Sequence, residues 1–125
     1  MEYDIYYFIE KVENIPEHLF CTGELKNKSG QSCINGHCGL NSTRYPTTES
    51  LALIKLFDHI TVHDLAGNAI HDYPYYCNKA AYINNGYTKE YQQTSIKDRV
   101  LAALHDIETV IAIKQFELIE EGVFV

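Results

Sequence analysis

The chain has 125 residues, of which 46% are hydrophobic and 22% are charged, and its formal net charge is −7. These values predict one ordinary globular domain with a buried core and argue against disorder. They also argue against nucleic-acid and membrane partners, because no run of Lys and Arg could neutralise phosphates and no apolar run reaches the ~20 residues of a membrane span.

The amino-terminal region predicts a helix over residues 4–14. Asp4 is a suitable N-cap, and Pro16 would end the segment. The apolar residues of this region recur at helical spacing, as Ile5, Phe8, Ile9 and Val12.

The next region predicts a β-hairpin. Residues 19–25 have an extended pattern, and the polar turn that follows ends at Gly30, which can adopt a positive φ. The return strand is expected at Ser32-Cys33-Ile34.

The middle of the chain predicts a second helix after Pro46, capped by Thr47 or Thr48. Its expected inner face consists of Leu51, Ile54, Phe57 and Ile60.

Two less regular segments follow. Residues 61–72 predict another hairpin, with its turn at Ala66-Gly67-Asn68. Residues 73–93 are rich in Tyr and polar residues, and we expect a loop there with one short strand near Ala81–Asn84.

The last element is predicted to be a long helix capped by Thr94 or Ser95 and ended by Gly122. Its apolar residues repeat at steps of three and four, as Ile96, Val100, Leu104, Ile107 and Ile111.

The predicted fold is therefore a single α+β domain over residues 1–125, with about three helices packed on short antiparallel hairpins. Because the apolar pattern continues to Phe116 and beyond, we expect residues 108–125 to dock on a second copy, which makes the protein a homodimer.

The cysteines are expected to be free thiols. Residues 1–10 do not resemble a secretory signal, which favours a cytoplasmic setting where cysteines stay reduced. Cys33 and Cys38 are separated by four residues, at the edge of the spacing seen in zinc sites, and no second pair of this kind exists. We therefore expect no cofactor, with a zinc site or a cysteine nucleophile at Cys33, His37 and Cys38 as the alternatives.

A polar, aromatic pocket is the remaining candidate site. Tyr rings stack on flat ligands, while amides and Arg recognise polar edges, so this composition suits a small polar ligand such as a nucleotide. The alternative is a Tyr-rich loop packed on the last helix. The candidate ligand-binding residues are Tyr76, Tyr82, Asn84, Asn85, Arg99 and His37.

Several short motifs also resemble a family of small bacterial and phage domains of unknown function. The motifs are Phe20-Cys21-x-Gly23, then Cys33-x-x-Gly36-His37, then Ile83-Asn84-Asn85, then a helix that begins at Thr94. The family pattern has a Trp-Cys-x-Gly strand, a Cys-x-x-Gly segment followed by His or Ala, and a Trp-Asn-Asp motif. This chain departs from the pattern at both Trp positions and at the Asp, where it has Asn85. The resemblance implies a compact α+β fold and a bacterial or phage origin, and it implies no activity.

The function expected from these observations is that of a non-catalytic binding or interaction protein. No H-E-x-x-H motif, no Walker A loop and no G-x-G-x-x-G motif is present. An acidic accessory factor of a phage or bacterium that acts on a host protein, for example against a host defence, fits best. The alternatives are a nucleotide or small-molecule binder that uses the Tyr/Asn/Arg region, and a Cys/His zinc domain or cysteine-dependent enzyme.

Overall fold

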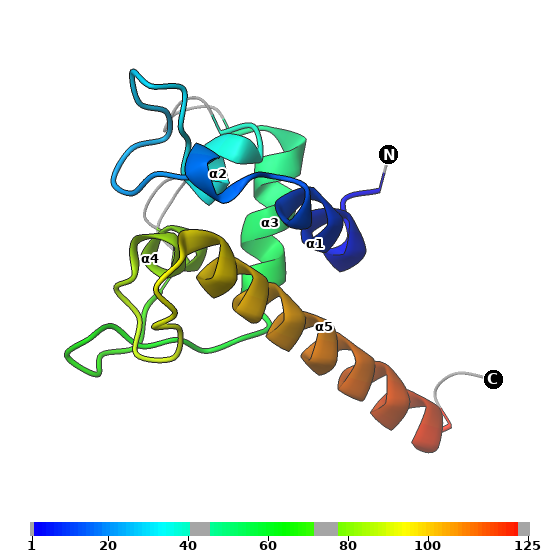
Figure 1. Cartoon of the computed structure of the whole chain (residues 1–125). Coiled ribbons are helices and arrows are strands. Elements are labelled where there is room, and N and C mark those ends of the chain that lie inside the picture. The colour runs from blue at the N-terminus through cyan, green and yellow to red at the C-terminus, as the bar shows by residue number, and fades with distance from the viewer. Residues whose placement is uncertain (1, 41–45, 72–77, 123–125) are drawn as a thin grey trace.

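The protein folds into a mainly helical domain, shown in Figure 1 as a computed structural model that describes residues 2–40, 46–71 and 78–122. The helices in chain order are α1 (Ile5–Glu13), the short 3₁₀ helix η1 (Glu17–Leu19), α2 (Ile34–His37), α3 (Thr48–Phe57), α4 (Lys79–Asn85) and α5 (Ile96–Glu120). No helix in these three ranges is both long enough and apolar enough to cross a lipid bilayer.

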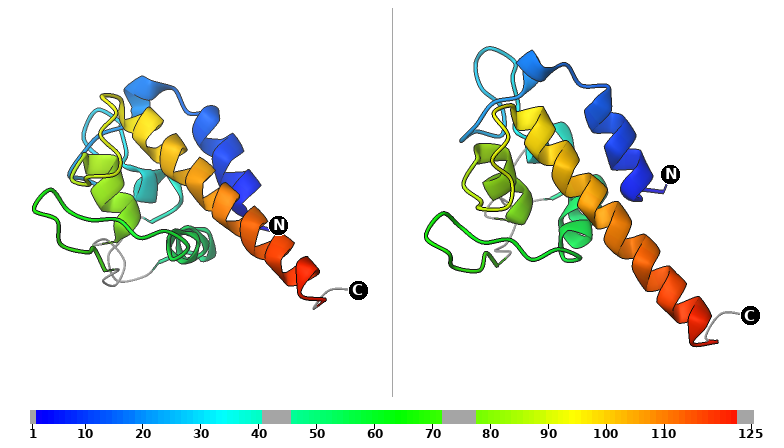
Figure 2. Two further views of the ribbon diagram at one scale, coloured as in Figure 1. Left: turned by 90° about the horizontal axis from the view of Figure 1, so that it is seen from below. Right: turned by 60° about the horizontal axis from the view of Figure 1, so that its bottom comes forward.

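The core forms around the first half of α5. Helix α1 lies antiparallel alongside this half, and α4 packs against it from another side (Figure 2). The side chains of α5 that face this core are completely buried, at Val100, Ala103, Leu104 and Ile107. From α1 they meet Ile5, Phe8, Ile9 and Val12, the four residues that the sequence pattern predicts.

The helix starts follow the predicted capping chemistry. The Asp4 carboxylate accepts a hydrogen bond from the backbone N–H of Tyr7 at 2.9 Å, and Ser95 Oγ accepts one from Asp98 at 3.1 Å. Thr47 and Ser50 form a reciprocal capping box at the start of α3. These contacts satisfy backbone donors that have no partner inside the helix, which is why each helix begins at that residue.

The inner face of α3 differs in part from the predicted one. Phe57 and Ile60 are buried as expected, but Leu51 is exposed and Leu53 takes the core position. The spacing alone does not decide whether Leu51 or Leu53 faces the core, because α3 has apolar residues on more than one side.

The predicted α+β fold is wrong. Within the described residues there is no sheet, and strand pairing is limited to isolated bridges such as Phe20 with Ser32 and His63 with Ala69. The first hairpin fails because Cys33 is the N-cap of α2, so the expected return strand becomes helical at Ile34. The second segment does reverse direction, but a pairing this short cannot build a sheet.

One side chain stabilises the reversal at residues 64–68. Asp64 accepts hydrogen bonds from the backbone N–H groups of Ala66 and Asn68, each at 2.9 Å. The bond from the N–H of Asn68 is the main reason why the pKa of the Asp64 carboxyl lies below its ordinary value, with desolvation acting in the opposite direction. This Asx turn acts together with backbone hydrogen bonds across the loop, from the N–H of Asp64 to the carbonyl of Asn68 at 2.8 Å and from the N–H of Ile70 to the carbonyl of Val62 at 2.9 Å.

The short strand predicted near Ala81–Asn84 is also wrong, because these residues lie in α4. The Oδ1 atom of Asn78 caps this helix by accepting from the N–H of Ala81 at 2.9 Å. At the other end Gly86 adopts a φ of 78°, the left-handed conformation that commonly ends a helix. The Asn84-Asn85-Gly86 sequence therefore forms the end of a helix.

Candidate functional site

Asn84, one of the predicted ligand-binding residues, lies at the centre of a buried polar network. Its Oδ1 atom accepts from the N–H of Ile34 at 2.9 Å, and its Nδ2 atom donates to the carbonyl of Cys21 at 2.9 Å. Its side chain is fully buried. Asn84 thus joins α4 to the start of α2 and to the segment after η1, and these contacts occupy its amide.

Arg99 is a second member of this network. Its Nη2 and Nε atoms donate to the carbonyls of Asn84 and Ile83, at 2.7 and 3.1 Å. Its Nη1 atom donates to the carbonyls of Gln93 and Thr94, at 2.7 and 3.1 Å. A cation at the C-terminal end of α4 also interacts favourably with the helix dipole. Burial lowers the pKa of this guanidinium, but an Arg side chain stays protonated in proteins. Its hydrogen bonds therefore join the end of α4 to α5.

A pair of buried amides, which the sequence analysis did not single out, completes the network. The side chains of Asn35 and Asn78 exchange two hydrogen bonds, each of 3.2 Å. Asn35 is on α2 and Asn78 caps α4, so the pair fixes these short helices against each other. Only the proximity of several Asn residues to predicted turns could have suggested it, and that signal is weak.

The other predicted ligand-binding residues divide between this network and its surroundings. Asn85 joins it, because its Oδ1 atom accepts from Asn84 Nδ2 at 3.1 Å and from the N–H of Gly23 at 3.1 Å. Tyr82 is half-buried against the core. His37 stacks edge-on against Phe20, with ring centroids 4.8 Å apart. Tyr76 lies outside the described residues.

Burial shifts the pKa values of His37 and of the nearby thiols. The Nε2 atom of His37 lies 2.9 Å from the carbonyl oxygen of Leu19, and burial lowers its pKa. Burial raises the pKa of the Cys38 thiol to about 12 and also raises the pKa of Cys33. A nucleophilic cysteine needs the opposite shift. Among the residues placed by the structure no three His, Cys, Asp or Glu side chains gather as metal ligands, and Cys77 lies outside those residues.

A charged cluster connects α1 to α3. The Glu49 carboxylate accepts hydrogen bonds from Lys11 Nζ at 2.5 Å and from the Tyr7 hydroxyl at 2.6 Å. The bond to Glu49 is the main reason why the pKa of Tyr7 is raised. A catalytic tyrosine would need a lowered pKa to lose its proton, so we interpret this cluster as a structural tie between the helices.

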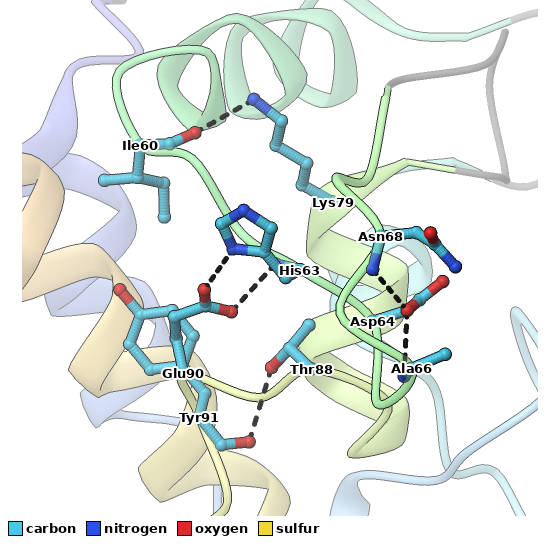
Figure 3. A network of polar contacts seen from close by, with 9 residues as sticks. All are labelled: Ile60, His63, Asp64, Ala66, Asn68, Lys79, Thr88, Glu90 and Tyr91. Carbon is cyan, nitrogen blue, oxygen red and sulfur yellow. Dashed lines mark hydrogen bonds and ion pairs between the residues drawn. The ribbon is translucent and has the colours of Figure 1, made fainter.

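Figure 3 shows a polar network that connects the loop after α3 to the segment after α4. Glu90 accepts from the backbone N–H of His63 at 2.8 Å, and its other oxygen lies 2.6 Å from the Nδ1 atom of His63. Lys79 Nζ donates to the carbonyl of Ile60 at 2.9 Å, and Thr88 donates to the carbonyl of Tyr91 at 3.4 Å. The network holds two loops together and leaves the His63 and Glu90 side chains partly exposed.

The second half of α5 has a different character from every site above. From Ala112 onward every described residue of α5 is exposed. Figure 2 shows this part of the helix extending beyond the rest of the domain. Four large apolar side chains lie on it, with 51% of Ile113, 61% of Phe116, 36% of Leu118 and 58% of Ile119 accessible to solvent. Large apolar side chains that are exposed together are typical of a surface that binds a partner or a ligand.

One side of this projecting helix forms a shallow, open depression with Tyr6 of α1. We call it the α5 face, and its neutral residues are Tyr6, Thr109, Ala112, Ile113 and Phe116. Three carboxylates border it, from Glu108, Glu117 and Glu120. The helical spacing places the apolar residues in the middle, with Glu108 and Glu117 on opposite flanks.

Comparisons of the chain with protein families, with curated proteins and with solved structures found no match.

Proposed function

We propose that the protein is a non-catalytic interaction module that presents the second half of α5 to a protein partner. One observation carries the proposal, namely that a helix anchored in the core continues for about 13 Å as an exposed apolar element, at 1.5 Å per residue over residues 112–120. An isolated segment of this length would be a poor helix in water, because helix nucleation is costly. The docked half supplies the nucleus, so the projecting half is preorganised for binding.

The polar residues of the domain support the same interpretation. The amide of Asn84 and the guanidinium of Arg99 already bond to the protein, so a ligand would have to break those bonds to use them. The thiols of Cys33 and Cys38 have raised pKa values and are buried. The α5 face, in contrast, offers apolar area that no described part of the chain covers.

A photo-crosslinking experiment tests this proposal. The full chain carries p-benzoylphenylalanine at position 113 and is irradiated in a lysate of its native host. We expect a discrete adduct that disappears when Phe116→Glu is added, because a carboxylate in the middle of the face opposes apolar contact.

Leu65 provides a matched control, since 59% of its side chain is exposed, close to the value for Phe116, and it lies in the turn at residues 64–68. Leu65→Glu should leave the adduct unchanged. The proposal is wrong if position 113 gives no adduct, or if Leu65→Glu and Phe116→Glu reduce it equally.

A further inference from the structure

The side chains of the α5 face indicate what kind of protein it fits, and this inference rests on the proposed function. Thr109, Ala112, Ile113 and Phe116 follow the spacing i, i+3, i+4 and i+7. This is the spacing with which an amphipathic helix places its anchors in a hydrophobic groove of a partner. The aromatic ring of Phe116, 61% exposed, is the largest anchor.

The carboxylates that border the α5 face all carry negative charge, and among the described residues the one basic group in contact with them is the imidazole of His105, whose Nδ1 atom lies 3.3 Å from Glu108. Glu108, Glu117 and Glu120 line this face, and no Lys or Arg does. Lys114 is the only basic residue between positions 108 and 122, and its Nζ atom lies 3.3 Å from the Nδ1 atom of His59. The helical spacing puts Lys114 on the side of α5 opposite Phe116, so it cannot neutralise this border.

These charges disfavour a second copy of the chain as the partner. A two-fold dimer uses the same patch on both subunits, so it would bring three glutamates from each copy into one interface. No base of the patch would compensate them, and each chain has a net charge of −7. Like charges that meet in an interface oppose association.

We infer that the α5 face binds a different protein, through a hydrophobic groove edged by Lys or Arg side chains. Ile113 and Phe116 fill the groove, while Glu108, Glu117 and Glu120 meet the basic edge. The apolar anchors supply most of the affinity, and the glutamates supply selectivity for a basic partner and speed its association.

The test uses the protein that crosslinks to position 113, purified and titrated against the full chain. We expect binding to weaken between about 50 mM and about 500 mM NaCl, because salt screens charges at the edge of an interface. Glu117→Gln combined with Glu120→Gln should weaken binding roughly 3- to 10-fold at low salt, as expected for two exposed charge pairs.

Glu13→Gln combined with Glu24→Gln is the matched control, since both residues are exposed and neither lines the α5 face. This control should bind as tightly as the original chain. The inference is overturned if the Glu117/Glu120 variant and high salt leave affinity unchanged, even though Phe116→Glu abolishes binding. It is also overturned if the adduct has twice the 14.3 kDa mass of the chain, which would identify a second copy. If the adduct at position 113 forms equally well with Phe116→Glu, that result contradicts the proposed function instead.

Discussion

The two halves of α5 both carry apolar residues at helical spacing, but they have opposite environments. Val100, Leu104 and Ile107 in the first half are fully buried, whereas Ile113 and Phe116 in the second half are more than half exposed. Apolar residues recur along the whole helix, but Ile113 and Phe116 follow Ile111 by two and five residues, so they lie on a different side of α5 from the buried residues, in the half that extends beyond the described part of the domain. The apolar residues of one helix can therefore form two separate faces, and their spacing does not report whether the cover of each face belongs to the same chain.

The largest expected effect separates the two halves by stability. Leu104→Ala should destabilise the fold by about 2–5 kcal/mol, because it leaves a cavity among fully buried neighbours. Phe116→Ala should change the free energy of unfolding by no more than about 0.5 kcal/mol. Urea unfolding of both variants measures the difference. Equal losses would mean that Phe116 is already part of a folded core.

Arg99 tests whether polar contacts also anchor the first half of α5. Arg99→Met removes the partner of four carbonyl groups, among them those of Ile83 and Asn84, and should cost about 2–3 kcal/mol. Chemical unfolding gives this value, and Lys55→Met serves as the exposed control with an expected loss below about 1 kcal/mol. If Arg99→Met leaves the free energy of unfolding unchanged, water replaces the guanidinium at the end of α4.

The start of α5 gives a smaller effect. Ser95→Ala removes the cap that accepts from the N–H of Asp98, and also a 2.7 Å hydrogen bond to Glu17. We expect a loss of about 1 kcal/mol in stability, measured by thermal unfolding. Gln115→Ala in the projecting half should be nearly neutral. If Gln115→Ala lowers the stability as much as Ser95→Ala does, the projecting half of α5 also makes stabilising contacts within the domain, which contradicts the difference between the two halves.

The smallest expected effect lies in the loops of Figure 3, outside α5. Glu90→Gln should cost about 0.5 kcal/mol at neutral pH, the usual size for an exposed charged pair. Burial raises the pKa of Glu90, but the hydrogen bonds from His63 outweigh it, so the net shift is downward. The contribution of Glu90 is therefore complete above the ordinary Glu pKa near ~4.3 and is lost as the pH falls through the lowered value.

Urea unfolding at several pH values checks this prediction. The stability difference between the original chain and Glu90→Gln should shrink toward zero in acid. A difference that grows as the pH falls would mean that the carboxylate does not stabilise the loops through its charged form.

The sequence predicted the elements whose signals are local and strong. Asp4 and Ser95 are helix caps, and the buried face of α5 follows the expected residues Val100, Leu104 and Ile107. A capping residue followed by a long apolar repeat has few alternative interpretations. These are also the elements that form most of the core.

The short helices could not be predicted in the same way. Helix α2 has four residues and α4 has seven, too few to display a helical period. Their stability comes from tertiary bonds, such as those of Asn84 to Ile34 and Cys21, which join residues at least 50 positions apart. Asn84, Asn85 and Arg99 did prove to lie together, but their polar atoms are directed at the backbone of the protein or at one another.

Hydrogen exchange along α5 in the purified protein tests the central claim most directly. We predict slow exchange for the amides of residues 100–111, which open only with the core, and exchange at least tenfold faster for residues 114–120, which can fray locally. The difference should persist as the protein concentration rises. Uniform slow exchange along the whole helix, or protection of residues 114–120 that grows with concentration, would contradict the account, because the α5 face would then already be covered in the isolated protein.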